Sequence, residues 1–162
     1  SVDSLALYLP TEGLGFTLPA PADLPIGEPV SLDVRLVAGD VIEMDIRNVV
    51  LTRLPHADAR TYAAEAWRLT FEIFPFEPQH LVLETVSLVT SPGSVGGGTR
   101  GREWIQTTDG TRPPKGPIES WIILEELPDE PIEVRVSAVA ARVLGPWEIT
   151  WLPREPVGSQ SR

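Results

Sequence analysis

The segment Ile132-Glu133-Val134-Arg135-Val136-Ser137-Ala138 decides the fold class, because its apolar and polar residues alternate with a period of two. A Gly145-Pro146 break follows, and Trp147-Glu148-Ile149-Thr150-Trp151 then alternates again. Upstream lie a Thr108-Asp109-Gly110 turn and the short apolar run Trp121–Leu124. Successive side chains of a strand point to opposite faces, so this pattern puts one face on a core and the other in water. The pattern is typical of antiparallel β-sheet.

Further strands are predicted along the rest of the chain, and the clearest alternation is in Trp67–Ile73. The others span residues 5–9, 14–18, 30–36, 41–51, 81–89 and 104–107. Gly39-Asp40 predicts a turn, and a change of apolar parity at Arg47-Asn48 predicts a β-bulge or a strand that changes sheets. We therefore predict an all-β antiparallel sandwich of about nine strands. Its predicted core is Trp67, Leu69, Phe71, Ile73, Val134, Val136 and Ile149.

With 162 residues, the chain is predicted to form a single β-sandwich domain over residues 1–162. Residues 1–29 would be proline-rich N-terminal strands and a connection, and residues 153–162 a C-terminal tail. Helix signals are few, and Glu77-Pro78-Gln79-His80 could begin a single helical turn. The absence of cysteine excludes disulfides and thiolate metal sites.

Charge and composition limit the classes of partner. A formal net charge of −10 argues against nucleic acid and against anionic membranes, since both bind through Lys and Arg. No apolar run approaches the length of a transmembrane helix, so we expect no direct membrane insertion of this segment, and an anchor would lie outside it. Seventeen prolines, most of them between the predicted strands, also fit a thermophile source.

A search for reactive groups gives no catalytic residue, no metal site and no cofactor. His56 and His80 are far apart and belong to no ligand-spaced motif. The acidic pairs Glu125-Glu126 and Asp129-Glu130 are adjacent in sequence, so their members would point to opposite faces of a strand. A weak calcium site assembled between Thr108–Gly110 and the loop that holds the second acidic pair remains an alternative.

The glycine-rich stretch Ser91–Thr99 resembles neither a nucleophile elbow nor a phosphate loop, although it contains Ser91 and Ser94. Consecutive glycines predict that Ser91–Arg102 is the most mobile internal segment. Arg100 and Arg102 alone are a weak phosphate clamp, and we expect no nucleotide binding.

Four of the five tryptophans lie late in the chain, at Trp104, Trp121, Trp147 and Trp151. They could form an aromatic platform for sugars or bases. Each also lies in a strand-like run with aliphatic residues of the same parity. We therefore predict core packing, with one or two tryptophans at a sheet edge.

The second half of the chain resembles the immunoglobulin-like extracytoplasmic domains of bacterial membrane proteins of the anti-sigma-factor-like type, a family of unknown function. The resemblance rests on Trp67–Ile73, Asp109-Gly110, Trp121–Pro128 and Gly145-Pro146-Trp147-Glu148-Ile149. It implies an immunoglobulin-like sandwich outside the cytoplasm, secreted or at the cell surface, with a role in sensing or protein interaction. The family carries no catalytic residues that could be transferred.

The N-terminal half is similar to the PilZ barrels, which bind cyclic di-GMP, in Thr11–Leu18 followed by Leu24–Leu32. The chain lacks an Arg before Arg35, and its turn lacks the Asp and Ser of that motif. Such a relative would be degenerate and without its ligand. We therefore expect a non-catalytic interaction or sensory module whose partner is a protein. The alternative is a ligand-binding β-domain for carbohydrate, or the degenerate PilZ-like module.

Overall fold

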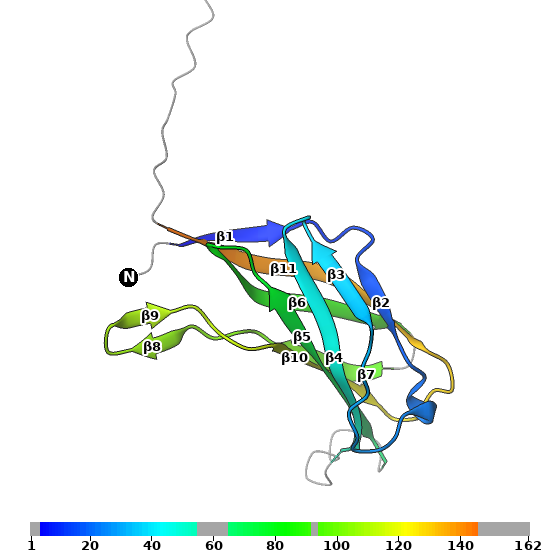
Figure 1. The fold of residues 1–162 in the computed structure, drawn as a ribbon. Coiled ribbons are helices and arrows are strands. Elements are labelled where there is room, and N and C mark those ends of the chain that lie inside the picture. The colour runs from blue at the N-terminus through cyan, green and yellow to red at the C-terminus, as the bar shows by residue number, and fades with distance from the viewer. Residues whose placement is uncertain (1–3, 55–64, 92–93, 146–162) are drawn as a thin grey trace, which may run out of the picture.

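The computed structural model describes residues 4–54, 65–91 and 94–145. These residues form strands and connections, with one 3-10 turn at Pro21–Asp23 (Figure 1). The strands are β1 (Ser4–Leu9), β2 (Gly15–Leu18), β3 (Val34–Ala38), β4 (Ile42–Arg53), β5 (Trp67–Phe76), β6 (Leu81–Ser91), β7 (Ser94–Arg100), β8 (Ile105–Thr107), β9 (Gly110–Arg112), β10 (Ile118–Leu124) and β11 (Ile132–Leu144). The all-β prediction is confirmed for this part of the chain.

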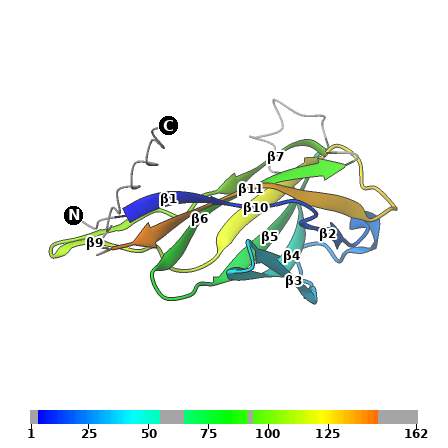
Figure 2. The same ribbon diagram turned by 90° about the horizontal axis from the view of Figure 1, so that it is seen from above.

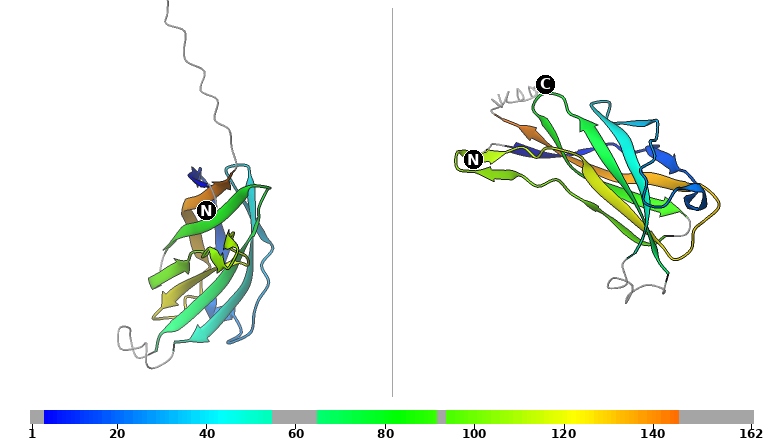
Figure 3. Two further views of the ribbon diagram at one scale, coloured as in Figure 1. Left: turned by 90° about the vertical axis from the view of Figure 1, so that its left-hand side faces the viewer. Right: turned by 60° about the horizontal axis from the view of Figure 1, so that its bottom comes forward.

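Two antiparallel sheets make up the body of the molecule (Figure 2). The larger sheet has the strand order β3-β4-β5-β10-β7. In the other sheet, β11 pairs with β6 along one edge, while β1 and β2 follow each other along its opposite edge. Neither sheet closes into a barrel, which argues against the PilZ-like alternative for the fold. The hairpin β8–β9 is a separate two-stranded sheet that projects from the body (Figure 3).

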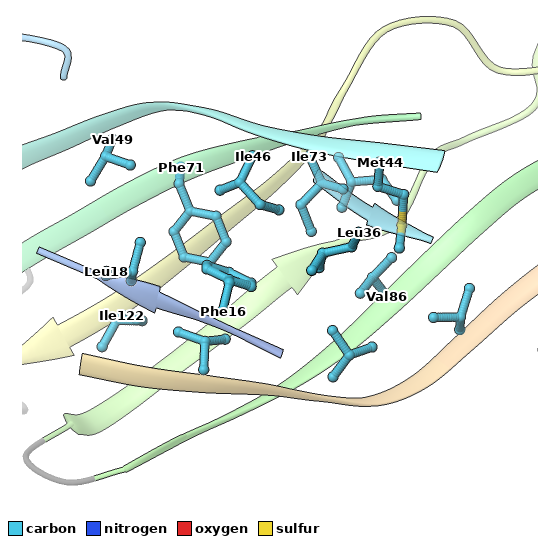
Figure 4. Close-up of a cluster of buried hydrophobic side chains, with 14 of the residues drawn as sticks. Phe16, Leu18, Leu36, Met44, Ile46, Val49, Phe71, Ile73, Val86 and Ile122 are labelled. Carbon is cyan, nitrogen blue, oxygen red and sulfur yellow. The ribbon is translucent and has the colours of Figure 1, made fainter. Parts of the chain in front are cut away.

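One hydrophobic core lies between the two larger sheets (Figure 4). Leu69, Phe71 and Ile73 of β5 are buried on the inner face, as their parity predicts. The rings of Phe71 and of Phe16 from β2 meet edge to face, 5.6 Å apart, and so join the two sheets. The predicted core members Val134 and Val136 are buried as well, whereas Trp67 is half-buried at the border of the core. The predicted core residue Ile149 lies outside the described residues.

Two local features follow the sequence closely. Gly39 and Asp40 both have a φ of 56°, as in the primed turns that match the twist of a hairpin, and they connect β3 to β4. In β4 the pairing with β5 shifts between Arg47 and Val50, and Asn48 has a φ of 55°. The predicted β-bulge is therefore confirmed. Because of it, Ile46 and Val49 both point into the core, although they are an odd number of residues apart.

Four predictions of local structure differ from what is observed. The strand predicted from residue 30 begins only at Val34, because Val30 forms an isolated bridge with Val49. The strand predicted from Trp104 begins at Ile105. Residues 77–80 form a turn in which His80 has a φ of 67°, so no helical turn begins there. Most of the glycine-rich stretch, from Ser94 onward, belongs to a strand, which is described below. The predicted strand at 147–151 and the predicted tail at 153–162 lie outside the described residues.

Candidate binding groove

Ser94–Arg100 of the glycine-rich segment, for which the sequence predicted mobility and no strand, forms an edge strand of the larger sheet. β7 runs antiparallel to β10, with Gly97 opposite Ile122 and Gly98 opposite Trp121. A Cβ atom on Gly97 would lie 2.7 Å from the carbonyl oxygen of Trp121, and one on Gly98 would lie 2.6 Å from its indole Cζ2. Glycine is needed at both positions because β7 packs directly on β10.

A groove of about 520 Å³ lies between β6 and β7. β6 supplies Thr85–Leu88 and Thr90, β7 supplies Gly96–Thr99, and β10 supplies Trp121 and Ile122. None of these residues carries a charge, in a chain whose formal net charge is −10. The groove therefore favours an uncharged ligand, because burial of an unpaired charge there would carry a large desolvation penalty.

Both strands that border the groove have an unpaired edge. Within the described residues, β6 pairs only with β11, and β7 pairs only with β10. At one end of the groove the edge of β6 is occupied, since the Arg102 N–H donates a hydrogen bond to the Glu84 carbonyl oxygen at 2.8 Å. Beyond this point, within the described residues, no other strand pairs with the outer edge of β6 at Thr85–Leu88.

Trp121 borders the groove from the outer face of the larger sheet. In β10, Ser120 and Ile122 are buried on the inner face, and Trp121 between them is half-buried on the opposite face. The prediction of core packing is therefore wrong for Trp121. Its indole lies against Gly98 and forms part of a second hollow on the outer face of the sheet.

This outer hollow, of about 500 Å³, contains charges of both signs. The side-chain amide of Asn48, at the β-bulge, donates a hydrogen bond to the carboxylate of Glu72. Arg100 Nη1 lies 3.8 Å from Glu119 Oε2, and both side chains are largely exposed. Asn48 and Arg100 thus already have carboxylate partners within the protein.

Arg102 has a different environment and is fixed inside the protein. Its side chain is 5% exposed, and Nη1 donates to Glu77 Oε1 at 2.7 Å and to the Leu83 carbonyl oxygen at 3.0 Å. Nη2 donates to the Pro114 carbonyl oxygen at 2.8 Å. Arg100 and Arg102 therefore do not converge on one ligand, and Arg102 holds both ends of the hairpin segment against β6.

A second polar cluster, around Glu84 of β6, holds the start of the same segment at Trp104. The indole N–H of Trp104 donates to Glu84 Oε1 at 2.8 Å, and Arg142 Nε donates to the same oxygen at 2.7 Å. Arg142 Nη1 continues to Ser4 Oγ at 3.1 Å. Trp104, which is half-buried, therefore has a structural hydrogen bond, while Trp147 and Trp151 lie outside the described residues.

On the outer face of β3 and β4, Asp45 lies between two arginines. Arg35 Nε donates to Asp45 Oδ1 at 2.8 Å and Arg47 Nη2 to Oδ2 at 2.7 Å. The hydrogen bond from Arg35, followed by that from Arg47, lowers the pKa of Asp45, and the same bond raises the pKa of Arg35. Arg47 also stacks over Phe74, with its guanidinium carbon 4.8 Å from the ring centre. This cluster therefore stabilises the sheet surface.

The reactive residue types singled out from the sequence are not brought together. His56 lies outside the described residues, and His80 is exposed in its turn, where its carbonyl oxygen accepts the Leu144 N–H. Glu125-Glu126 and Asp129-Glu130 are exposed between β10 and β11. In the part of the chain that is described, no three His, Asp or Glu side chains are placed to hold a metal ion. The side chains of Ser91 and Ser94 lie outside that part.

The groove could not be recognised from the sequence, because its two walls, β6 and β7, follow each other in the chain but belong to different sheets. The signal that was present, three consecutive glycines, predicted flexibility instead. Comparison with protein-family models, with curated proteins and with solved structures found no match to this chain. The described residues contain no helix of the length and apolarity that crossing a membrane requires.

Proposed function

We propose that this domain is a non-catalytic protein-interaction module that binds an uncharged, extended peptide segment in the groove between β6 and β7. We further propose that it has an immunoglobulin-like sandwich fold and acts outside the cytoplasm. The single observation that carries the proposal is that, within the described residues, no strand pairs with the groove-facing edges of β6 at Thr85–Leu88 and of β7 at Gly96–Thr99, on the two sides of one uncharged groove.

The physical argument is that of strand addition to a sheet edge. An unpaired edge presents a row of backbone donors and acceptors, and an extended peptide satisfies them with its own backbone. Gly97 and Gly98 have no side chains that could cover the backbone of β7, so a peptide can approach that strand closely. Alternate side chains of the peptide would contact Trp121 and the hydroxyl groups of β6.

The non-catalytic part of the proposal is supported by the chemistry of the groove. Nucleophilic or acid–base catalysis needs an ionisable group within hydrogen-bonding reach of the reacting atom. The side chains that line the groove are aliphatic, aromatic or hydroxylic, and none of them is an acid, a base or a cation.

The fold and location are supported by two sheets that enclose one core and by the sequence resemblance. Two segments on which that resemblance rests lie in paired strands, since Trp67–Ile73 belongs to β5 and the first four residues of Trp121–Pro128 belong to β10. The acidic chain without cysteine is compatible with an exported domain, and the proposal does not depend on an anchor.

The experiment is a selection of displayed random peptides of about ten residues on the purified domain, because this length matches a long strand. We expect the selected peptides to be uncharged and rich in β-branched residues. Synthetic copies should shift the amide resonances of Gly96–Thr99 and of Thr85–Leu88. Shifts confined to other strands would contradict the proposal.

A charge in the groove provides the matched test. Ser87 is exposed and lines the groove, so Ser87→Lys should weaken peptide binding about tenfold or more by placing an ammonium in the site. Ser31 is exposed outside the groove, and Ser31→Lys makes the same change in charge and size. Equal peptide affinities of the two variants would remove the groove as the binding site.

A second candidate function, carbohydrate binding, is favoured by one observation. Trp121 is half-buried beside the hydroxyl-bearing residues Thr85, Ser87 and Thr90, and neutral sugars bind through stacking on aromatic rings and through hydroxyl groups. A neutral glycan array with a fluorescence titration separates the two candidates. Glycan binding that is lost in Trp121→Ala, in a domain that selects no peptides, would favour carbohydrate.

A further inference from the structure

Strand β1 is an exposed apolar edge, separate from the groove. Leu5, Leu7 and Tyr8 are 57%, 37% and 77% exposed, and Ala6 between them is exposed as well. Among the described strands, β1 pairs only with β11, along one side, so no described strand pairs with its other edge. An exposed, apolar, unpaired strand is a site at which another strand adds.

The leucines of β1 continue the inner face of their sheet. Leu9 belongs to the core, and Leu5 and Leu7 share its parity along the strand. Leu5 lies opposite Val143 of β11, which is half-buried. The apolar inner surface of this sheet thus extends past the buried core to Leu5 and Leu7, which are exposed.

The outer strand of the larger sheet provides a contrast. β3 presents Arg35, which pairs with Asp45 at 2.8 Å and with Glu43 at 3.4 Å. Charged side chains on an edge strand oppose pairing with another copy, because like charges would meet. Ser4–Leu9 contains no charged residue, so the same protection is absent from β1.

We propose that β1 pairs antiparallel with β1 of a second copy of this chain, so that the two smaller sheets become one continuous sheet. A twofold axis perpendicular to the sheet keeps both copies on the same faces, and one residue then lies opposite itself. With Ala6 at the axis, Leu5 lies opposite Leu7 of the second copy and Ser4 lies opposite Tyr8. This register uses residues 4–8 and leaves the buried Leu9 in place.

The sequence of β1 is suited to pairing with an identical strand of a second copy. At the axis, the small side chain of Ala6 meets an identical small side chain without a clash. On the leucine face, two Leu5–Leu7 pairs form a cluster of four leucines, and cross-strand apolar pairs stabilise a sheet. No charge is brought opposite a like charge within the paired segment, despite the net charge of each copy.

Sedimentation velocity on the whole chain tests the association. We expect a weak dimer with a dissociation constant of about 100 µM, as befits a small interface. Ala6→Lys places two ammonium groups opposite each other at the axis, and should raise this constant about fivefold or more. Val37→Lys, on the exposed part of β3, is the matched control and should leave it unchanged. A wild-type protein that stays monomeric at about 1 mM, or equal constants for the two variants, overturns the proposal.

Cross-linking tests the register in a protein that has no cysteine of its own. Directly opposite residues of an antiparallel pair have Cα atoms about 4.5–5.5 Å apart, within disulfide range. Under mild oxidation, Ala6→Cys should therefore form a covalent dimer faster than Leu7→Cys or Val37→Cys. A covalent dimer that forms equally fast at all three positions overturns the register, since it would report random collision.

Discussion

The ion pair between the buried side chain of Arg102 and the half-buried side chain of Glu77 should be one of the most sensitive positions in this protein. Arg102 is 5% exposed and donates to Glu77 Oε1, while Glu77 Oε2 accepts the Leu83 N–H at 2.6 Å. Glu77→Ala removes the carboxylate and leaves a buried guanidinium without its counter-charge. It also leaves the Leu83 N–H without this acceptor.

The expected loss follows from these contacts. Removing one partner of a buried ion pair costs about 3–5 kcal/mol, because the remaining charge is still desolvated. The exposed pair Arg100–Glu119 is the internal comparison, with side chains 74% and 60% exposed and 3.8 Å between the charged atoms. Exposed pairs contribute about 0–1 kcal/mol. Glu77→Ala should therefore destabilise the fold by about 3 kcal/mol more than Glu119→Ala.

Urea unfolding of both single variants, of Arg102→Met and of the double variant Glu77→Ala/Arg102→Met measures this difference. The double variant should be clearly less destabilised than the sum of its singles, since it contains no buried charge. The reasoning is refuted if Glu77→Ala is no more destabilising than Glu119→Ala, or if the double-mutant cycle shows additive effects.

Three further predictions concern the strands and the sheet surface. Gly97→Ala should destabilise the fold by about 1–3 kcal/mol, because the added Cβ atom meets a backbone oxygen of β10. Gly101→Ala should cost less, because its Cβ atom meets the methyl group of Thr85, which can rotate away. The urea unfolding midpoints of the two variants measure this difference. Asp45→Asn should lower the stability of the fold at neutral pH, because the lowered pKa of Asp45 means that folding favours its ionised form. The difference from the wild type should disappear as the pH falls below about 4, where the carboxylate becomes protonated, and urea unfolding at both pH values measures it. Far-ultraviolet circular dichroism should show less than about a fifth helix, and a larger fraction would contradict the all-β fold.

The sequence predicts the strands best where side chains report on two different environments. In Trp67–Ile73 every second residue is apolar, and Leu69, Phe71 and Ile73 are buried as expected. The change of parity at Arg47-Asn48 predicted the bulge for the same reason, because each side of it retains its own alternation. Periodicity works at these sites because one face of the larger sheet packs on the hydrophobic core and the other faces water.

Glycine and tryptophan show why the candidate groove was not predictable. A strand of glycines has no side chains to alternate, so Gly96–Gly98 gave no β signal, and its pairing with β10 is a non-local contact. Trp121 begins an apolar run that continues with Ile122 and Ile123 in the sequence, yet its side chain lies on the outer face against Gly98. Each residue explains the position of the other, and neither position follows from the sequence of one strand.

The strand edges of the two larger sheets differ in how they are protected, and this difference connects the two proposals. β3 has a charged edge at Arg35, and β2 is only four residues long, which are two ways in which proteins prevent edge pairing. Among the described strands, β1, β6 and β7 lack such a device along part of their length. β6 and β7 lie on two sides of one groove, so a single inserted strand could satisfy both edges, whereas β1 stands alone and can pair only outward. A groove that accepts a peptide and an edge that accepts a second copy can therefore operate together, since neither uses the backbone groups of the other.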